Sequence, residues 1–200
     1  MHEKGGRMHK SQESGGKNSN FNLLEEEKMT CTIAATDYNN IDMSMNESEF
    51  EVVTFKQNLR EMIWNLHCGG VTDFYINSEY GVPIWAGETI IGLKNYNDIR
   101  LHIIVPYENQ CSYWHEYWRE KYYKVHEFCD TVRFASIDYS DECFAEADEL
   151  MADESDMVLI FGDQTEKFHI AEYAKNNGVA VEYVGIDKLM QRAGGQINGE

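Results

Sequence analysis

Hydrophobic and polar residues follow two distinct patterns along this 200-residue chain. Short apolar runs rich in β-branched residues are typical of strands buried on both faces, whereas apolar positions that recur every three or four residues are typical of helices. The clearest short run is Leu101–Val105, which only His102 interrupts and which Pro106 follows. Because proline cannot donate a hydrogen bond to a neighbouring strand, we predict a buried strand that ends at Pro106.

Five further runs predict strands, and the segments between the runs predict helices. The predicted strands cover residues 30–36, 71–76, 101–105, 131–135, 156–161 and 179–184. The predicted helices cover residues 46–68, 84–94, 114–123, 141–151 and 165–177, and a short helix is expected after residue 184. Strands and helices that alternate through short loops imply right-handed crossovers. We therefore predict an α/β fold with a doubly wound, mostly parallel sheet of about six strands and helices on both faces.

The composition divides the chain into three parts. Residues 1–28 are rich in Gly, Ser, Asn and Lys, and we expect a flexible leader there. Residues 29–186 carry the alternating pattern of strands and helices and are predicted to form a single domain. Residues 187–200 end in a Gly-rich stretch and are predicted to form a C-terminal tail.

Acidic residues dominate the predicted domain. The chain has a formal net charge of −18, from 17 basic and 35 acidic residues. Residues 1–28 contain five of each kind, so the whole excess of negative charge falls on the remaining residues. Such a domain repels a phosphate backbone, and we expect no nucleic-acid partner. Solubility alone is the simplest explanation of the charge.

The sequence also predicts where the protein is found and which chemistry it lacks. It contains no apolar run close to the ~20 residues of a membrane-spanning helix, and its N-terminal residues lack the apolar core of a signal peptide. Its five cysteines form no C-x-x-C pair, which is typical of reduced thiols. We therefore expect a cytoplasmic protein without a membrane partner. The seven histidines are scattered, and we expect no metal site and no cofactor.

Three segments carry motifs of a known family. Residues 71–88 contain a G-V-x-x-W-A-x-E run, residues 106–114 read P-Y-x-x-Q-x-x-x-W, and residues 151–156 read M-x-D-x-S-D. Together they resemble the YpsA-type branch (the DUF1273 group) of the SLOG superfamily, which is related to the lysine-decarboxylase-like phosphoribohydrolases. The resemblance covers about residues 30 to 184. It implies a Rossmann-like domain and a small nucleotide-like ligand.

The chain departs from this family at the positions that bind phosphate. Where the family has paired glycines after its second strand, the chain reads Asn77-Ser78-Glu79, and a Gly-Gly-Thr trio expected after Gly162 is missing. The family's G-H-R segment reads Ala35-Thr36-Asp37, and residues 144–150 lack its arginine. Carboxylates in the altered loops would repel a phosphate. The resemblance therefore identifies a divergent member.

Eight residues form the candidate ligand-binding site, at the carboxyl ends of predicted strands where open α/β sheets bind ligands. They are Ser78, Gly81, Glu88, Pro106, Tyr107, Gln110, Trp114 and Gly162. Gln110 and Trp114 would hold a base or ribose by hydrogen bonding and stacking, and Glu88 would contact a ribose hydroxyl. In the structural alternatives, Gln110 caps the next helix, Trp114 packs in the core and Glu88 is an ordinary surface glutamate. No residue is assigned a catalytic role.

The aromatic residues between Tyr113 and Tyr123 are too many for one buried helix face, so we expect some of them in a homodimer contact. The function that we predict is the binding of a small nucleotide-derived ligand in a sensing or regulatory role, without catalysis. Two alternatives stay open. One is a nucleotide phosphoribohydrolase, an N-glycosidic hydrolase, which needs a glycine-rich phosphate loop and an Arg/Glu pair. The other is a ligand-free homodimeric interaction module.

Overall fold

The chain forms a single six-stranded sheet in which every neighbouring pair of strands is parallel. The computed structural model describes residues 28–35, 46–165, 167–186 and 189. The strands are β1 (Met29–Ala35), β2 (Val71–Ile76), β3 (Arg100–Tyr107), β4 (Thr131–Ser136), β5 (Met157–Phe161) and β6 (Ala180–Val184). They lie in the order β4-β3-β2-β1-β5-β6. This confirms the predicted α/β fold.

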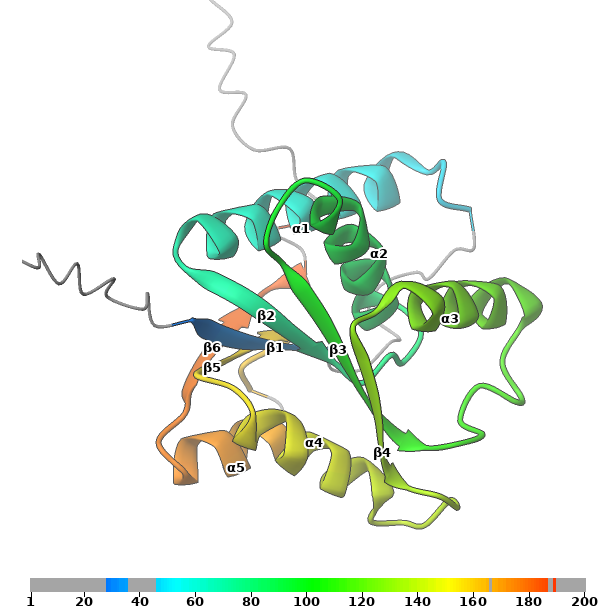
Figure 1. Cartoon of the computed structure of the whole chain (residues 1–200), viewed down its shortest axis with the longest axis vertical. Helices are drawn as coiled ribbons and strands as arrows, with labels where there is room; N and C mark the ends of the chain where they lie inside the picture. The colour runs from blue at the N-terminus through cyan, green and yellow to red at the C-terminus, as the bar shows by residue number, and fades with distance from the viewer. Residues whose placement is uncertain (1–27, 36–45, 166, 187–188, 190–200) are drawn as a thin grey trace, which may run out of the picture.

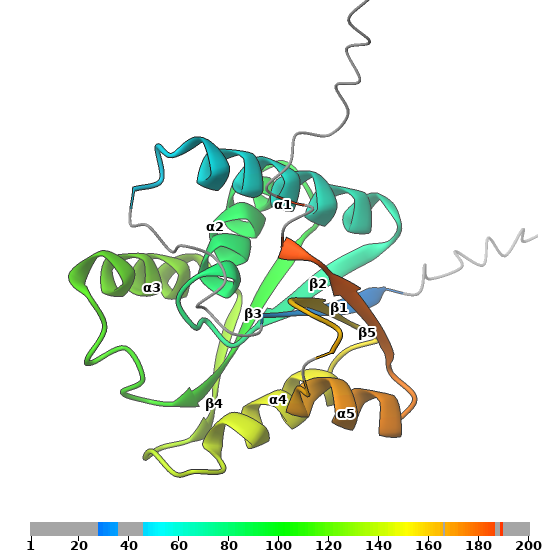
Figure 2. The same ribbon diagram turned by 180° about the vertical axis from the view of Figure 1, so that it is seen from behind.

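Helices cover both faces of the sheet. They are α1 (Phe50–Cys68), α2 (Val82–Lys94), α3 (Glu116–Phe128), α4 (Cys143–Asp153) and α5 (His169–Asn176). Figure 1 shows α1, α2 and α3 on one face and α4 and α5 on the other, and Figure 2 shows the same layers from behind. The direction of strand addition reverses at β1, which lies between β2 and β5. This topological switch point is where open α/β sheets bind ligands.

Each face of the sheet has its own hydrophobic core. The larger core lies under α1, α2 and α3, where the Phe55 ring lies 5.6 Å from that of Trp85 and 6.3 Å from that of Phe161, centroid to centroid. The smaller core lies under α4 and α5 and uses small side chains such as Ala147 and Ala171. Because both faces are packed, β5 consists of apolar residues alone, whereas β1, β2 and β3 also contain polar side chains such as Thr32, Asp73 and His102.

Two element boundaries differ from the prediction around the candidate site. The prediction that Pro106 ends its strand is wrong, because β3 continues to Tyr107, which pairs with Ser136 of β4. Pairing with β2 has already ended at Ile103, so the missing N–H of Pro106 falls where β3 has one neighbour. The aromatic helix begins at Glu116 rather than at residue 114, because the side chain of the preceding His115 caps it.

The helix predicted at residues 165–177 is also shorter than expected. Helix α5 begins at His169 instead of residue 165, since the Thr165 N–H donates to Asp163 Oδ1 at 2.9 Å and closes a local turn. The predicted leader lies outside the described residues except for Lys28, and the predicted tail does so except for Leu189. Leu189 is buried and its carbonyl accepts from Asn58 Nδ2 at 2.6 Å, so core packing extends to this residue. Among the described residues, no helix is long and apolar enough to cross a membrane.

Substitution by alanine should change the free energy of unfolding in opposite directions at two glycines of α2. A Cβ at Gly87 would lie 2.8 Å from Val125 Cγ1 and 3.0 Å from Ile76 Cδ1, whereas a Cβ at Gly92 would meet nothing closer than Arg60 at 3.7 Å. We expect Gly87→Ala to lower the free energy of unfolding by about 1–3 kcal/mol through overpacking. Gly92→Ala should raise it by about 0.5–1 kcal/mol through helix propensity.

Urea denaturation of the two variants and the wild type measures both changes. Equal changes in the free energy of unfolding for the two variants would contradict the packing described here.

Candidate functional site

The candidate residues gather along the carboxyl edge of the sheet. Ser78 and Gly81 follow β2, Tyr107 and Gln110 lie at and just after the end of β3, and Gly162 follows β5. The structure brings Gln110 of the loop after β3 against Asn77 and Ser78 of the loop after β2, whereas Gly162 follows β5 on the other side of β1. The contacts below show which of their polar atoms are already paired.

Ser78 holds the most constrained position in the turn after β2. Its side chain is fully buried, and its φ of 52° places it in the left-handed region, which costs free energy for a residue with a Cβ. Its Oγ lies 3.1 Å from Nε2 of His126 and accepts a hydrogen bond from Nε2 of Gln110 at 3.2 Å. Ser78 therefore links the loop after β3 to helix α3.

Gln110 joins the turns that follow β2 and β3. Its Nε2 also donates to the Asn77 carbonyl at 3.3 Å, which fixes the orientation of the amide, because a carbonyl can only accept. The Oε1 atom then points elsewhere. It is buried and has no hydrogen-bond partner among the described residues. The alternative in which Gln110 caps the next helix is wrong, since His115 caps α3.

Trp114 packs against other aromatic rings. Its ring is perpendicular to those of Tyr80 and Tyr122, at centroid distances of 5.2 and 5.6 Å, an edge-to-face geometry that stabilises aromatic pairs. The side chain is partly buried and lies against the larger core. This contact supports the structural interpretation of Trp114 and leaves its predicted stacking on a ligand a prediction.

His126 is the residue of this site that the sequence analysis missed. Burial lowers its pKa from 6.5 to about 4, so the imidazole is neutral at physiological pH. Its ring packs against that of Tyr122 at 3.9 Å between centroids, and its Nε2 contacts Ser78. Ser78 and His126 are 48 positions apart, so no local pattern could have revealed the pair.

Glu88 is held in an ion-pair cluster instead of facing open solvent. Its Oε1 lies 2.7 Å from the ammonium of Lys121 on α3, and its Oε2 lies 3.2 Å from that of Lys56 on α1. The same two lysines contact Glu47, which precedes α1, at 2.8 and 3.0 Å. The cluster, made of these four residues, therefore ties α1, α2 and α3 together.

Glu47 is the most heavily hydrogen-bonded member of this cluster. Besides the two lysines, it accepts from the hydroxyl of Tyr117 and from Nε1 of Trp85, the latter at 3.3 Å. Burial alone would raise the pKa of Glu47, but the hydrogen bonds from Lys121, Tyr117 and Lys56 outweigh it and lower the pKa from 4.5 to about 2. No motif of the sequence singles out Glu47, because its partners lie on three separate helices.

The two candidate glycines have different roles. Gly81 has a φ of 93°, which a side chain would strain, and it precedes α2, where its carbonyl accepts from the N–H of Trp85 at 3.0 Å. The N–H of Gly162 donates to the carbonyl of Val184 at 3.0 Å and so belongs to the sheet. In this structure, that N–H is engaged within the protein rather than directed at an anion.

The electrostatics of this edge disfavour anions. Burial, and after it the negative charge of Glu79, raise the pKa of Asp148 from 3.8 to about 7, although His169 and the Ile170 N–H act in the opposite direction. Asp148 lies on α4, and Glu79 is in the turn after β2. The carboxylate of Glu79 thus already raises the free-energy cost of ionising Asp148. A phosphate in the same place would face the same repulsion.

No group of three or more His, Cys, Asp or Glu side chains that could hold a metal ion occurs among the residues that the structure describes. All five cysteines are free, and the three buried ones lie on β1, after β3 and on α4 (Cys31, Cys111 and Cys143).

Comparisons with known proteins connect this site to a family. The profile described as the YspA SLOG family matches residues 33–189. A UPF0398 protein of Staphylococcus epidermidis (SERP1017) is 25% identical over 174 residues, which cover 80% of this chain and 92% of the relative. A UPF0398 protein of Staphylococcus aureus (SaurJH9_1506) is 24% identical over 143 residues, 70% of this chain and 76% of the relative.

The ion-pair cluster predicts a specific dependence of stability on pH. Because the pKa of Glu47 is depressed, its ion pairs stabilise the folded chain fully above pH 4.5, and this stabilisation is lost as the pH falls from 4.5 to about 2. We expect Glu47→Gln to lower the free energy of unfolding by about 1–3 kcal/mol at pH 7 and by nearly nothing close to pH 2.

Urea denaturation across this pH range measures the effect. The matched control is Glu61→Gln, which changes an exposed glutamate of α1 that has no ion pair among the described residues. A constant difference between wild type and Glu47→Gln at every pH would contradict the assignment.

Proposed function

The chain belongs to the YspA SLOG family, and we propose that it binds the nucleoside part of a small nucleotide-derived ligand at the carboxyl edge of its sheet. The role is sensing or regulation without turnover. The proposal is supported by the strand order, in which β2 neighbours β1 at the switch point and β3 follows β2, and by the polar atoms that the loops after β2 and β3 present.

The observation that carries the proposal is the amide oxygen of Gln110. A buried acceptor without a donor costs roughly 1–3 kcal/mol, and proteins keep such atoms mainly where a ligand or water completes the bond. The N–H or O–H groups of a nucleoside are suitable donors. Ser78 supports the same conclusion, because strained backbone is retained most often at functional sites.

The charges of this edge favour a nucleoside over its phosphate. Glu79 and Asp163 lie in the loops after β2 and β5, and the described part of these loops contains one cation, Lys167. The phosphoribohydrolase alternative needs a cationic phosphate site that these loops do not provide. A neutral His126 with a pKa of about 4 is also a poor general base near pH 7.

We expect nucleosides to raise the melting temperature of the full chain more than the corresponding monophosphates or ADP-ribose do. A ligand at 100 times its dissociation constant stabilises a protein by ~2.7 kcal/mol. Differential scanning fluorimetry with Gln110→Ala should show that the ligand-induced shift disappears. The control Gln57→Ala, an exposed residue of α1, should retain it.

The comparison uses the shift within each variant, so a lower starting stability of Gln110→Ala does not affect it. The absence of a shift across the panel with wild type, or an equal shift in Gln110→Ala, would refute the proposal.

A second candidate function is homodimerisation, which a separate observation favours. β4 forms one edge of the sheet, and Val132 and Phe134 on it are 39% and 45% exposed. Tyr123 and Phe128 of α3 are 63% and 49% exposed. Exposed apolar side chains around an open strand edge are typical of an interface. A second copy of the chain would bury them by pairing along β4.

Analytical ultracentrifugation of the full chain tests this surface. We expect a dimer whose dissociation constant rises at least ~10-fold in Phe134→Lys, since a buried charge without a partner opposes association. Tyr96→Lys changes a residue that is 91% exposed on the loop before β3 and serves as the control. A wild type that remains monomeric at high micromolar concentration would exclude the dimer.

A further inference from the structure

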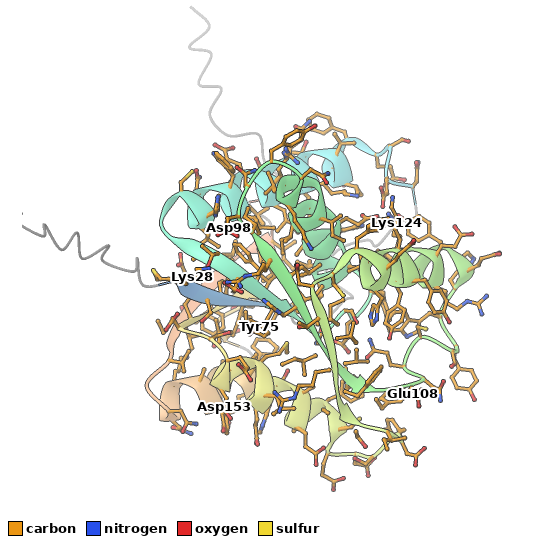
Figure 3. The ribbon with its side chains drawn as sticks, in the orientation of Figure 1. Lys28, Tyr75, Asp98, Glu108, Lys124 and Asp153 are labelled. Atoms are coloured by element: carbon orange, nitrogen blue, oxygen red, sulfur yellow. The ribbon has the colours of Figure 1, made fainter. Side chains whose placement is uncertain are left out.

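A cavity lies between the loops that follow β3 and β4, and neither Gln110 nor its partners Asn77 and Ser78 line it. Its volume is about 370 Å³, within the range of roughly 300–1,000 Å³ that is usual for small-molecule pockets. It is lined by Tyr107, Asn109, Ser112, Tyr113, Ile137, Asp138 and Tyr139. These residues come from the end of β3 and the loop after it, and from the loop that follows β4. Figure 3 labels Glu108 where β3 ends, next to this second loop.

Short contacts hold the two loops in place. The Glu108 N–H donates to the Ile137 carbonyl at 3.3 Å and joins one loop to the other. The hydroxyl of Ser136 donates to the Asp138 carbonyl at 2.8 Å and closes the turn that carries the Asp138 side chain. The backbone of the cavity is therefore fixed although several of its side chains are exposed.

Aromatic rings form much of the cavity wall. Tyr107 and Tyr139 meet at 81° with their centroids 5.4 Å apart, so the two rings make a corner. The hydroxyl of Tyr139 donates to Asp141 at 3.4 Å, which orients the ring. Tyr113 is 98% exposed and stands at the rim. Rings arranged around a space in this way are the means by which proteins surround ammonium groups.

The charge of the lining agrees with this chemistry. None of the seven lining residues is basic, and the carboxylate of Asp138 has no hydrogen-bond or ion-pair partner among the described residues. The net charge of the whole chain, −18, concentrates cations and repels anions. A phosphate does not suit this cavity, whereas a cation with an apolar surface suits both the rings and the carboxylate.

We propose that this cavity is a binding site for a small organic ammonium compound. The tyrosine rings contact the cationic head through their faces, Asp138 balances its charge, and Asn109 and Ser112 are available to a polar tail. The site is distinct from the Gln110 acceptor of the nucleoside site proposed above, because neither Gln110 nor Ser78 lines it, although Tyr107 is a candidate residue of both.

The test uses choline and its neutral isostere 3,3-dimethylbutan-1-ol, which has the same shape without the charge. NMR titration of the full chain should show saturable binding of choline and binding of the isostere that is at least ~10-fold weaker, as expected if cation–π and charge interactions provide the affinity. Butylammonium, as a second arm, distinguishes a primary from a quaternary ammonium site. The proposal is supported if either cation binds more tightly than the neutral isostere.

Variants distinguish binding of choline in this cavity from a nonspecific attraction of choline to the acidic protein. Asp138→Asn and Tyr139→Leu should each weaken choline binding by ~10-fold, and Tyr139→Phe, which keeps the ring, should restore most of it. The matched control is Tyr96→Leu, which removes a 91% exposed tyrosine outside the cavity. Equal binding of choline and the isostere, no saturable choline binding, or wild-type binding by both Asp138→Asn and Tyr139→Leu would overturn the proposal.

The result is independent of the nucleoside experiment. Loss of choline binding in Asp138→Asn with an intact nucleoside shift would confirm two sites. A failure of choline binding leaves the Gln110 experiment unaffected.

Discussion

Burial of the central strands on both faces is the constraint on which this structure depends. Because α1, α2 and α3 cover one face and α4 and α5 the other, apolar side chains fill every position of β5 and the centre of β3, from Ile103 to Val105. Polar groups that serve a ligand then collect in the loops at the ends of strands. Strands are added on opposite sides of β1, so the order of strands reverses there. Open α/β sheets bind ligands at the carboxyl ends of their strands at such a point.

The polar atoms at this edge fall into two groups with different consequences. In the ion-pair cluster, Glu47 and Glu88 each contact Lys56 and Lys121, and these contacts join three helices. Ser78, Gln110 and His126 form an uncharged chain of hydrogen bonds that leaves one amide oxygen unpaired. The first group explains how the edge is held rigid. The second group, together with the nearby carboxylates, explains why we assign it a neutral, hydrogen-bonding ligand.

The sequence predicts the fold well because its signal is local and repeated. The apolar run at Leu101–Val105 is visible without any knowledge of its neighbours. Contacts between distant segments leave no such trace: neither the pairing of Ser78 with His126 nor the four partners of Glu47 could be predicted. The start of α5 was misplaced for a related reason, because a single hydrogen bond from Thr165 to Asp163 decides it.

The unpaired amide oxygen of Gln110 would accept the ligand's hydrogen bond, so the most direct measurement observes the side-chain amide of Gln110 by NMR while a nucleoside is titrated. If a ligand donor binds Oε1, the ¹⁵N and ¹H shifts of that amide change in step with ligand occupancy, while the amides of Asn97 and Gln57 stay constant. An unchanged Gln110 resonance at saturating nucleoside, with shifts elsewhere in the protein, would contradict the account and move the site away from the β2 and β3 turns.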